Sequence, residues 1–229
     1  KAFLESHQIS GKECCIGISC GGPLDSGRGV ILSPPNLPGW DQVPIVSYLE
    51  QRLDMDARLK NDADACALAE WRYGAGRGCR HMIFLTFGTG LGAGLVLNGR
   101  LYEGACGMAG EAGHVRLAEE GPVGYEKAGS FEGFCSGGGI ARLARSMAED
   151  ALNAGRPVSY MKEGGLDDIT ARDVAEAAEM GCADAGEVLA VSGRYFGRGL
   201  AMLVDILNPE RIVAGGIYAR AGRFLKDEM

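Results

Sequence analysis

Short apolar runs alternate along the chain with stretches of helical periodicity. Apolar runs of about four to eight residues that end in turn residues are typical of buried strands. The chain has three such runs, each soon followed by glycine, at 14–18, 81–87 and 211–214. Two further strands are predicted at 95–97 and 100–102, because the Asn98-Gly99 pair between them is a strong hairpin signal.

Helices are predicted between these strands. Helical spacing or composition occurs at 43–53, 62–73, 174–180 and 200–207. The helix over 62–73 is expected to begin at Asp62 and to end at Gly74. Thr170 and Asp173 are expected to cap the third helix. Because strands alternate with helices, the pattern predicts an α/β fold, and the change near 74–80 marks a candidate domain boundary.

Composition and charge exclude several classes of protein. The chain is 46% hydrophobic and 23% charged, which excludes a disordered chain. The formal net charge of -7 disfavours nucleic acid as a partner of these residues. No apolar stretch approaches the roughly 18 residues that span a bilayer, so we expect no membrane contact. Eight cysteines without a C-x-x-C pair indicate free thiols and a cytoplasmic protein.

Glycine is the outlier of the composition, at 37 of 229 residues. Its clusters lie at 17–29, 74–94, 104–113, 121–139 and 193–199. Such clusters mark tight turns or backbone that a ligand approaches closely. Two of them match known chemical motifs.

Gly17-Ile18-Ser19-Cys20-Gly21 fits the G-x-S-x-G nucleophile elbow, and Asp62 and His114 follow in the order of an α/β-hydrolase triad. The pattern is short and matches often by chance. The elbow also needs a helix directly after the serine, and the following Gly21-Gly22-Pro23 cannot begin one. The hydrolase interpretation is therefore the weaker one.

Gly88, Gly90 and Ala93 satisfy G-x-G-x-x-A, the dinucleotide-binding pattern, after a predicted strand. That motif must open a helix so that the pyrophosphate lies at its N-terminus, but a hairpin is predicted here. We therefore interpret the segment as a strand–turn–strand phosphate loop. In such a loop, backbone N–H groups and the hydroxyl of Thr86 or Thr89 would contact phosphate oxygens.

A third candidate is a set of polar residues in glycine-rich or helix-starting segments: Asn61, Asp62, Glu111, His114 and Glu132. Each alone has a structural explanation, since Asp62 fits a helix cap, Glu111 and His114 a local pair, and Glu132 a solvated side chain. Phosphoryl transfer to an alcohol needs a carboxylate for the hydroxyl proton, groups that hold a polyol and a loop for phosphates. Together these residues supply those parts.

These segments resemble the ROK family of sugar kinases and sugar-responsive repressors, in the hexokinase–actin ATPase superfamily, over nearly the whole chain. The matching motifs lie at 17–25, 35–40, 61–65, 88–92, 104–114 and 208–216. The resemblance implies an actin-like ATPase (ribonuclease H-like) fold of two α/β domains with a ligand cleft between them. Residues 1–75 would be a remnant of the N-terminal domain, and 76–229 would form the second domain.

The resemblance also assigns roles to residues. Asp62 would be the catalytic base that acts on the sugar hydroxyl. The other sugar-binding residues would be Asn36, Asn61, Glu111, His114 and Glu132. ATP, accompanied by Mg²⁺, would be bound by Gly88, Thr89, Gly90 and Gly92 at its phosphates and by Gly215 and Gly216 at its adenosine.

The chain departs from the family pattern at a metal site. Many members carry zinc on the histidine of the Gly-His pair and on three cysteines in C-x-C-G-x-x-G-C. Val123, Tyr125 and Ser130 stand at the cysteine positions here. His114 alone does not make a structural zinc site. We therefore predict no zinc and expect packing of Tyr125 and Phe131 to hold the loop.

A second departure concerns the family's other phosphate loop, an Asp-x-Gly-Gly-Thr strand and turn, which does not occur before Cys14. We therefore expect these residues to belong to a longer protein. The expected function is ATP-dependent phosphorylation of a hexose or N-acetylhexosamine, as in glucokinases, fructokinases and N-acetylmannosamine kinases, by a homodimer. The alternatives are a sugar-sensing transcriptional regulator and a catalytically inactive sugar-binding homologue.

Overall fold

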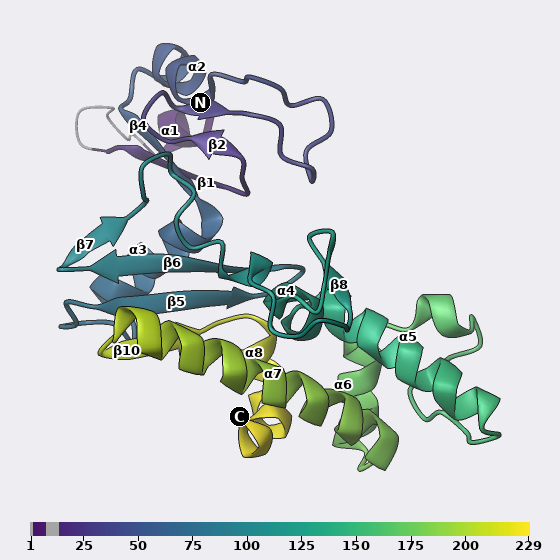
Figure 1. Ribbon diagram of the computed structural model, residues 1–229. Helices are drawn as coiled ribbons and strands as arrows, with labels where there is room; N and C mark the ends of the chain where they lie inside the picture. Colours follow the sequence, from purple (N-terminus) through teal and green to yellow (C-terminus); the bar gives the residue numbers. More distant parts are fainter. Residues whose placement is uncertain (1, 8–13) are drawn as a thin grey trace.

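The structure is a computed structural model that describes residues 2–7 and 14–229. The fold is mixed α/β, as the sequence predicts, but groups of strands and groups of helices follow one another rather than alternating singly (Figure 1). The strands are β1 (Ile16–Cys20), β2 (Leu24–Asp25), β3 (Val30–Ile31), β4 (Ala57–Asn61), β5 (Met82–Phe87), β6 (Leu91–Leu97), β7 (Arg100–Tyr102), β8 (Val123–Gly124), β9 (Lys127–Ala128) and β10 (Arg211–Ala214). The helices are α1 (Ala2–Ser6), α2 (Ile45–Leu53), α3 (Asp62–Tyr73), α4 (Phe131–Cys135), α5 (Gly137–Asn153), α6 (Ala171–Glu179), α7 (Ala183–Leu207) and α8 (Ile217–Leu225), with 3₁₀ turns at Ala112–His114, Leu166–Asp168 and Lys226–Glu228.

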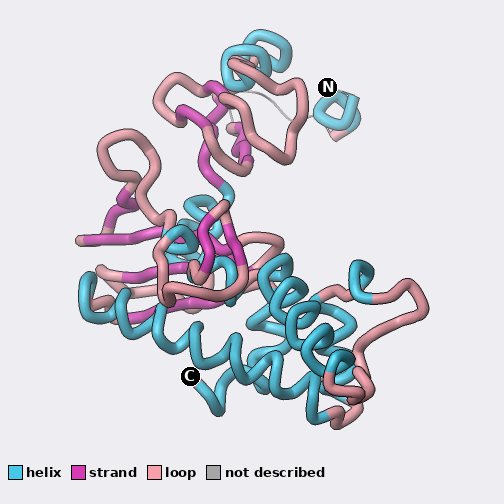
Figure 2. The backbone as a smooth tube through the Cα atoms, turned by 45° about the vertical axis from the view of Figure 1, so that its right-hand side comes forward, coloured by secondary structure: helices cyan, strands magenta, loops and turns pink. Residues whose placement is uncertain are grey.

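The largest sheet has four strands in the order β10-β5-β6-β7. β10 and β5 are parallel, whereas β5 with β6 and β6 with β7 are antiparallel. The predicted hairpin is confirmed, because Asn98 and Gly99 join β6 to β7 with φ values of 54° and 72°. The parallel pair β1–β4 lies apart from this sheet, together with α2 (Figure 1). Figure 2 shows the same order from another side, with this small part above the large sheet and the longest helices below it.

Both faces of β5 are covered, which explains why five of its six residues are apolar. Leu85 and Phe87 belong to a core formed with the helices α4 to α7. Met82 and Phe84 face the other way and pack in a second cluster with Ala67 of α3. Successive side chains of a strand point to opposite faces, so a strand between two layers of helices is apolar at almost every position.

Helix α3 packs directly against β6 at Gly94. A Cβ atom on Gly94 would lie 2.5 Å from the carbonyl oxygen of Ala63 and 2.5 Å from the Cβ of Ala67. Only glycine allows backbone to approach backbone this closely. The contact places the first turn of α3 beside the loop that joins β5 to β6. The predicted domain boundary after residue 75 stays a prediction.

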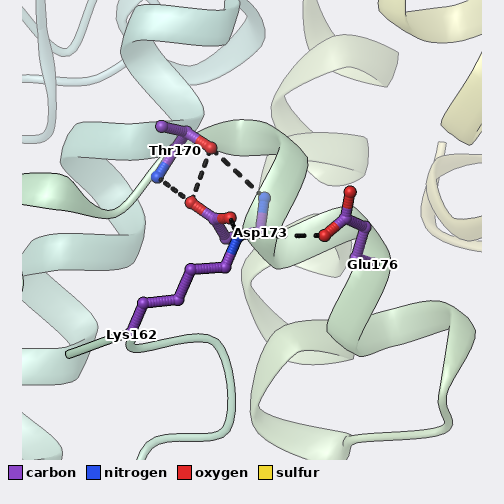
Figure 3. A network of polar contacts seen from close by, with 4 residues as sticks. All are labelled: Lys162, Thr170, Asp173 and Glu176. Atoms are coloured by element: carbon purple, nitrogen blue, oxygen red, sulfur yellow. Dashed lines mark hydrogen bonds and ion pairs between the residues drawn. The ribbon is translucent and has the colours of Figure 1, made fainter.

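Helix α6 begins with the capping box that Thr170 and Asp173 predict (Figure 3). The N–H of Thr170 donates to Asp173 Oδ2 at 2.9 Å, and the N–H of Asp173 donates to Thr170 Oγ1 at 3.3 Å. Lys162 also contacts the Asp173 carboxylate from the preceding loop and lies 3.9 Å from Glu176. Burial tends to raise the pKa of Asp173, but the hydrogen bonds from Lys162 and Thr170 outweigh it and lower this pKa.

Helix α7 is much longer than the segment 200–207 that the sequence predicts. Glycines within it, such as Gly193 and Gly199, lower helix propensity and interrupt the apolar pattern. In the structure they let neighbours approach, since a Cβ on Gly199 would lie 2.3 Å from the ring of Phe131. Tertiary packing therefore stabilises a helix that local propensity does not predict.

All eight cysteines have free thiols, as expected from their spacing. Across residues 2–7 and 14–229, the helices fall short of the length and apolar character needed to cross a membrane.

Replacing Gly94 by alanine is expected to destabilise the fold by about 1–3 kcal/mol, because the new methyl group overlaps the backbone of α3. Gly186→Ala in α7 is the matched control, since a Cβ there meets nothing within 4 Å. That change should stabilise the protein by about 0.5–1 kcal/mol through helix propensity. Denaturant unfolding of both variants measures the difference, and a Gly94→Ala protein as stable as the wild type would contradict the packing argument.

Candidate active site

A cavity of about 530 Å³ lies between the turn after β1, the first turn of α3 and the β5–β6 loop. Most of the predicted site residues line it: Asn36, Asn61, Asp62, Gly88, Thr89, Gly90, Gly92, Glu111, His114 and Glu132. Gly215 and Gly216 are outside the cavity wall. The fold thus brings the predicted sugar-binding and phosphate-binding residues into one space.

Asp62 is presented by the junction of a strand and a helix. Asn61 ends β4 and caps α3, and its Oδ1 accepts a hydrogen bond from the N–H of Ala63 at 2.9 Å. Asp62 Oδ1 accepts from the same N–H at 2.9 Å. A helix N-terminus stabilises an anionic side chain. The carboxylate of Asp62 is therefore held at a fixed place in the cavity wall.

The β5–β6 loop is the strand–turn–strand loop that the sequence predicts. Its turn is closed by the N–H of Gly88, which donates to the carbonyl of Gly90 at 3.0 Å, and β6 follows directly. The N-terminus of α5 lies against it, because the N–H of Gly137 donates to the carbonyl of Gly88 at 2.7 Å. Sequence reasoning did not identify this helix as part of the site, although glycines 137–139 were a visible signal. Backbone N–H groups in a glycine loop beside a helix N-terminus suit an anion such as phosphate.

Gly215 and Gly216 pack behind this loop rather than in the cavity. The N–H of Gly215 donates to the carbonyl of Leu85 at 3.0 Å. A Cβ on Gly216 would lie 2.1 Å from the carbonyl oxygen of Phe87, and its φ of +65° favours glycine. Close packing on β5 accounts for both glycines, and their role in adenosine binding stays a prediction.

The segment around Glu111 and His114 lies against β6 through two glycines. A Cβ on Gly110 would lie 1.9 Å from the carbonyl oxygen of Ala93 in β6. A Cβ on Gly113 would lie 2.0 Å from the carbonyl oxygen of Leu91 in the same strand. Glycine at both positions allows the segment to pack directly against β6. This packing places the side chains of Glu111 and His114 in the cavity wall. His114 Nε2 lies 3.4 Å from Glu111 Oε2, as the expected local pair.

Glu132 is more than a solvated side chain. Its Oε2 accepts a hydrogen bond from the N–H of Leu91 at 3.0 Å, which joins the first turn of α4 to the start of β6. A Cβ on Gly90 would lie 2.7 Å from the same oxygen. Glu132 therefore joins the first turn of α4 to the β5–β6 loop at the cavity wall.

The residues at the cysteine positions of the family do not fit a zinc ion. Val123, Tyr125 and Ser130 offer no thiolate, and within residues 2–7 and 14–229 no group of three His, Cys, Asp or Glu side chains could hold a metal. Instead the Tyr125 ring stacks on the His114 imidazole, with centroids 3.8 Å apart and an interplanar angle of 11°. Phe131 is fully buried in the core. Both aromatic rings are packed, Tyr125 on His114 and Phe131 in the core, and their role in holding the loop stays a prediction.

The hydrolase interpretation is wrong. Ser19 lies inside β1 and pairs with Lys60 of β4, and a turn rather than a helix follows that strand. Asp62 and His114 line the cavity, but Ser19 does not.

Cys66 and Met108 also line the cavity, and sequence reasoning missed both. Cys66 lies four residues after Asp62 on the same helix, so helical spacing was a signal that could have found it. Burial raises the pKa of the Cys66 thiol, and the nearby charge of Asp62 raises it further. Met108 belongs to an irregular segment, where the sequence carries no such signal.

A buried carboxyl, Asp64, lies close to the site in the first turn of α3. Its side chain is only 4% exposed, and its pKa is raised to about 6. Burial is the main cause and the charge of Glu103 adds to it, whereas the ammonium of Lys60 partly offsets both. Lys60 Nζ donates to both carboxylate oxygens of Glu103 at 2.7 Å.

A mixed α/β fold with this cleft and glycine loop defines the class: the protein has the actin-like ATPase fold, which structural neighbours share. The ROK family model matches residues 1–229, and the chain belongs to the ROK family. The structure is similar to that of a ROK family glucokinase from Streptomyces griseus in complex with glucose and AMPPNP. The TM-score is 0.77 at 30% identity, over 99% of this chain and 74% of that one.

Two relatives show the range of the family. The glucokinase of Halalkalibacterium halodurans is 38% identical over 223 residues, 96% of this chain and 66% of that protein. The xylose repressor of Caldicellulosiruptor bescii is 31% identical over 215 residues, 93% of this chain and 53% of that protein. The chain thus spans about two thirds of the glucokinase and half of the repressor.

Asp64→Asn is expected to stabilise the protein at neutral pH and not at acidic pH. Because the folded-state pKa of about 6 exceeds the ordinary 3.8, the folded protein binds this proton more tightly than the unfolded chain. The wild type therefore loses stability as the pH rises from about 4 to 6, by up to about 3 kcal/mol. The variant avoids this loss, so its advantage should appear over the same interval.

Unfolding curves from pH 4 to pH 8 check this, with Asp205→Asn on the exposed face of α7 as the control. An advantage for Asp64→Asn that is equal at all pH values would contradict the assignment.

Proposed function

We propose that the chain is part of an ATP-dependent sugar kinase that transfers the γ-phosphate of ATP to a hydroxyl of a hexose or N-acetylhexosamine. One observation carries the proposal: Asp62 shares a single cavity with the Gly88–Gly92 loop and with the polar side chains of Glu111, His114 and Glu132. The similarity to glucokinases, one of them in complex with glucose and AMPPNP, supports it.

The chemistry follows from the positions of these groups. A cyclic polyol offers several hydroxyls, and two carboxylates and an imidazole on one wall can accept and donate hydrogen bonds to them. Asp62 then orients the attacking hydroxyl and accepts its proton as the phosphoryl group moves. The backbone N–H groups of the β5–β6 loop hold phosphate oxygens of the second substrate, MgATP.

Mg²⁺ bound to ATP would supply neutralisation of the phosphate charge during transfer. Transfer is proposed to the terminal hydroxyl, since that group is the least hindered nucleophile of a hexose. Glucose is the first substrate to test, because the similar proteins include several glucokinases.

A sugar-sensing regulator is the second candidate. The similarity to the xylose repressor favours it, and such a protein would use the same polar wall for binding without phosphoryl transfer. The two functions differ in what Asp62 contributes. In a kinase its proton acceptance is needed for turnover, whereas in a regulator it is one hydrogen-bonding group among several.

Asp62→Asn in the complete protein is expected to lower kcat by about 10²–10⁴-fold and to change sugar affinity little, because the amide keeps the shape but cannot accept the proton. A coupled ADP-release assay with a panel of hexoses and N-acetylhexosamines measures kcat, and calorimetry measures sugar binding. Asp150→Asn, on the exposed side of α5, is the matched control.

Unchanged turnover in Asp62→Asn would refute the role of this residue. A wild type that binds sugar but transfers no phosphate would instead support the regulator.

A further inference from the structure

We infer that Tyr125 is a positioning residue that fixes the imidazole of His114 in the cavity wall and thereby strengthens sugar binding. The inference rests on the proposed function in one respect, that His114 contacts the sugar. Tyr125 lines the same cavity as His114 and stands at its mouth, with 61% of its surface exposed. No step of the proposed phosphoryl transfer uses its hydroxyl.

The geometry of the two rings shows how this works. The rings are nearly parallel, at 11°, and their centroids are 3.8 Å apart, so one face of the imidazole is covered. Glu111 Oε2 lies 3.4 Å from its Nε2, and Lys127 Nζ donates to the backbone carbonyl of His114 at 3.3 Å. The stack and the contact with Glu111 restrict rotation of the His114 ring, and the bond from Lys127 holds its backbone, which together lower the ordering cost when a ligand binds.

The hairpin that carries Tyr125 is itself anchored to the site. Tyr125 and Glu126 form the two-residue turn between β8 and β9, with φ values of 46° and 61°. Such turns usually take Asn-Gly, and a tyrosine in the left-handed region costs free energy that other contacts must offset. The stack on His114 is one contact that does so.

The base of this hairpin is fixed to the helix that carries Glu132. Ser130 Oγ donates to the carbonyl of Gly124 at 3.0 Å, and a Cβ on Gly124 would lie 2.4 Å from the backbone nitrogen of Gly133. The hairpin, α4 and the His114 ring therefore hold fixed positions relative to one another. Tyr125 completes this unit on the side of the cavity mouth.

Two substitutions separate the ring from the backbone of the turn. Tyr125→Gly removes the ring but suits a positive φ, so the hairpin keeps its shape. Tyr125→Phe keeps the ring and removes only the hydroxyl. Tyr73 is the last residue of α3 and is 86% exposed, so Tyr73→Ala is the control for loss of a surface tyrosine.

The first measurement is the NMR spectrum of the histidine rings in the complete protein. A tyrosine ring stacked at 3.8 Å shifts the His114 ring protons upfield, and loss of a signal in His114→Asn assigns it. These 229 residues contribute three histidines, and the His114→Asn comparison distinguishes His114 from every other histidine. We expect the upfield shift in the wild type, Tyr125→Phe and Tyr73→Ala, and its loss in Tyr125→Gly. An upfield shift that survives in Tyr125→Gly would overturn the inference without bearing on the kinase activity.

The second measurement is sugar binding and turnover. Loss of an aromatic stack should raise the KM and the Kd for sugar roughly threefold to tenfold in Tyr125→Gly, and Tyr125→Phe should restore both. The kcat should stay within about twofold, because a contact made equally in the ground state and the transition state affects binding alone. Equal Kd values in Tyr125→Gly and the wild type, or a fall in kcat without a change in KM, would overturn the positioning role.

A wild type that neither binds nor phosphorylates any sugar would refute the proposed function and the sugar-directed part of this inference together. The histidine spectrum would still show whether Tyr125 holds the ring. The two failures are therefore distinguishable.

Discussion

Contact of backbone against backbone along β6 is the constraint on which the rest of the site depends. α3 meets the strand at Gly94, and the segment that carries Glu111 and His114 meets it at Gly110 and Gly113. Side chains at these points would separate the elements by the width of a methyl group or more, and the functional groups would move with them. A single strand therefore serves as the common reference for Asp62, Glu111 and His114.

Close packing of these elements also brings their charged side chains near one another in the cleft. Carboxylates from several elements lie close together in the cleft. Their charges, together with burial, raise the pKa of Asp64, so its ionised form destabilises the folded state. The helix N-terminus at Asp62 and the Lys60–Glu103 ion pair offset part of this charge. A cleft that concentrates carboxylates is accordingly less stable than a neutral one of the same shape, as is common where function and stability compete.

The loop between β8 and α4 shows how one fold can fix the same histidine by different chemistry. Where the family pattern places zinc ligands, this chain has a strained hairpin whose Tyr125 ring lies on His114. The stack, the hydrogen bond from Ser130 to Gly124 and the neighbouring carboxylate of Glu111 replace coordination. Under the proposed function, the polar wall suits either a sugar kinase or a sugar-responsive regulator, and the two would differ in the use of Asp62 toward MgATP rather than in the shape of the cavity.

The sequence by itself determined the features that depend on neighbouring residues. The hairpin at Asn98-Gly99, the capping box at Thr170 and the strand–turn–strand form of the β5–β6 loop each follow from local backbone preferences. Only the tertiary structure decided the length of α7, the position of Gly215 behind the β5–β6 loop and the stack of Tyr125 on His114. Each of these three features depends on a contact between residues that are distant in the sequence or lie in irregular segments. The pattern of neighbouring residues does not predict the free energy of such a contact.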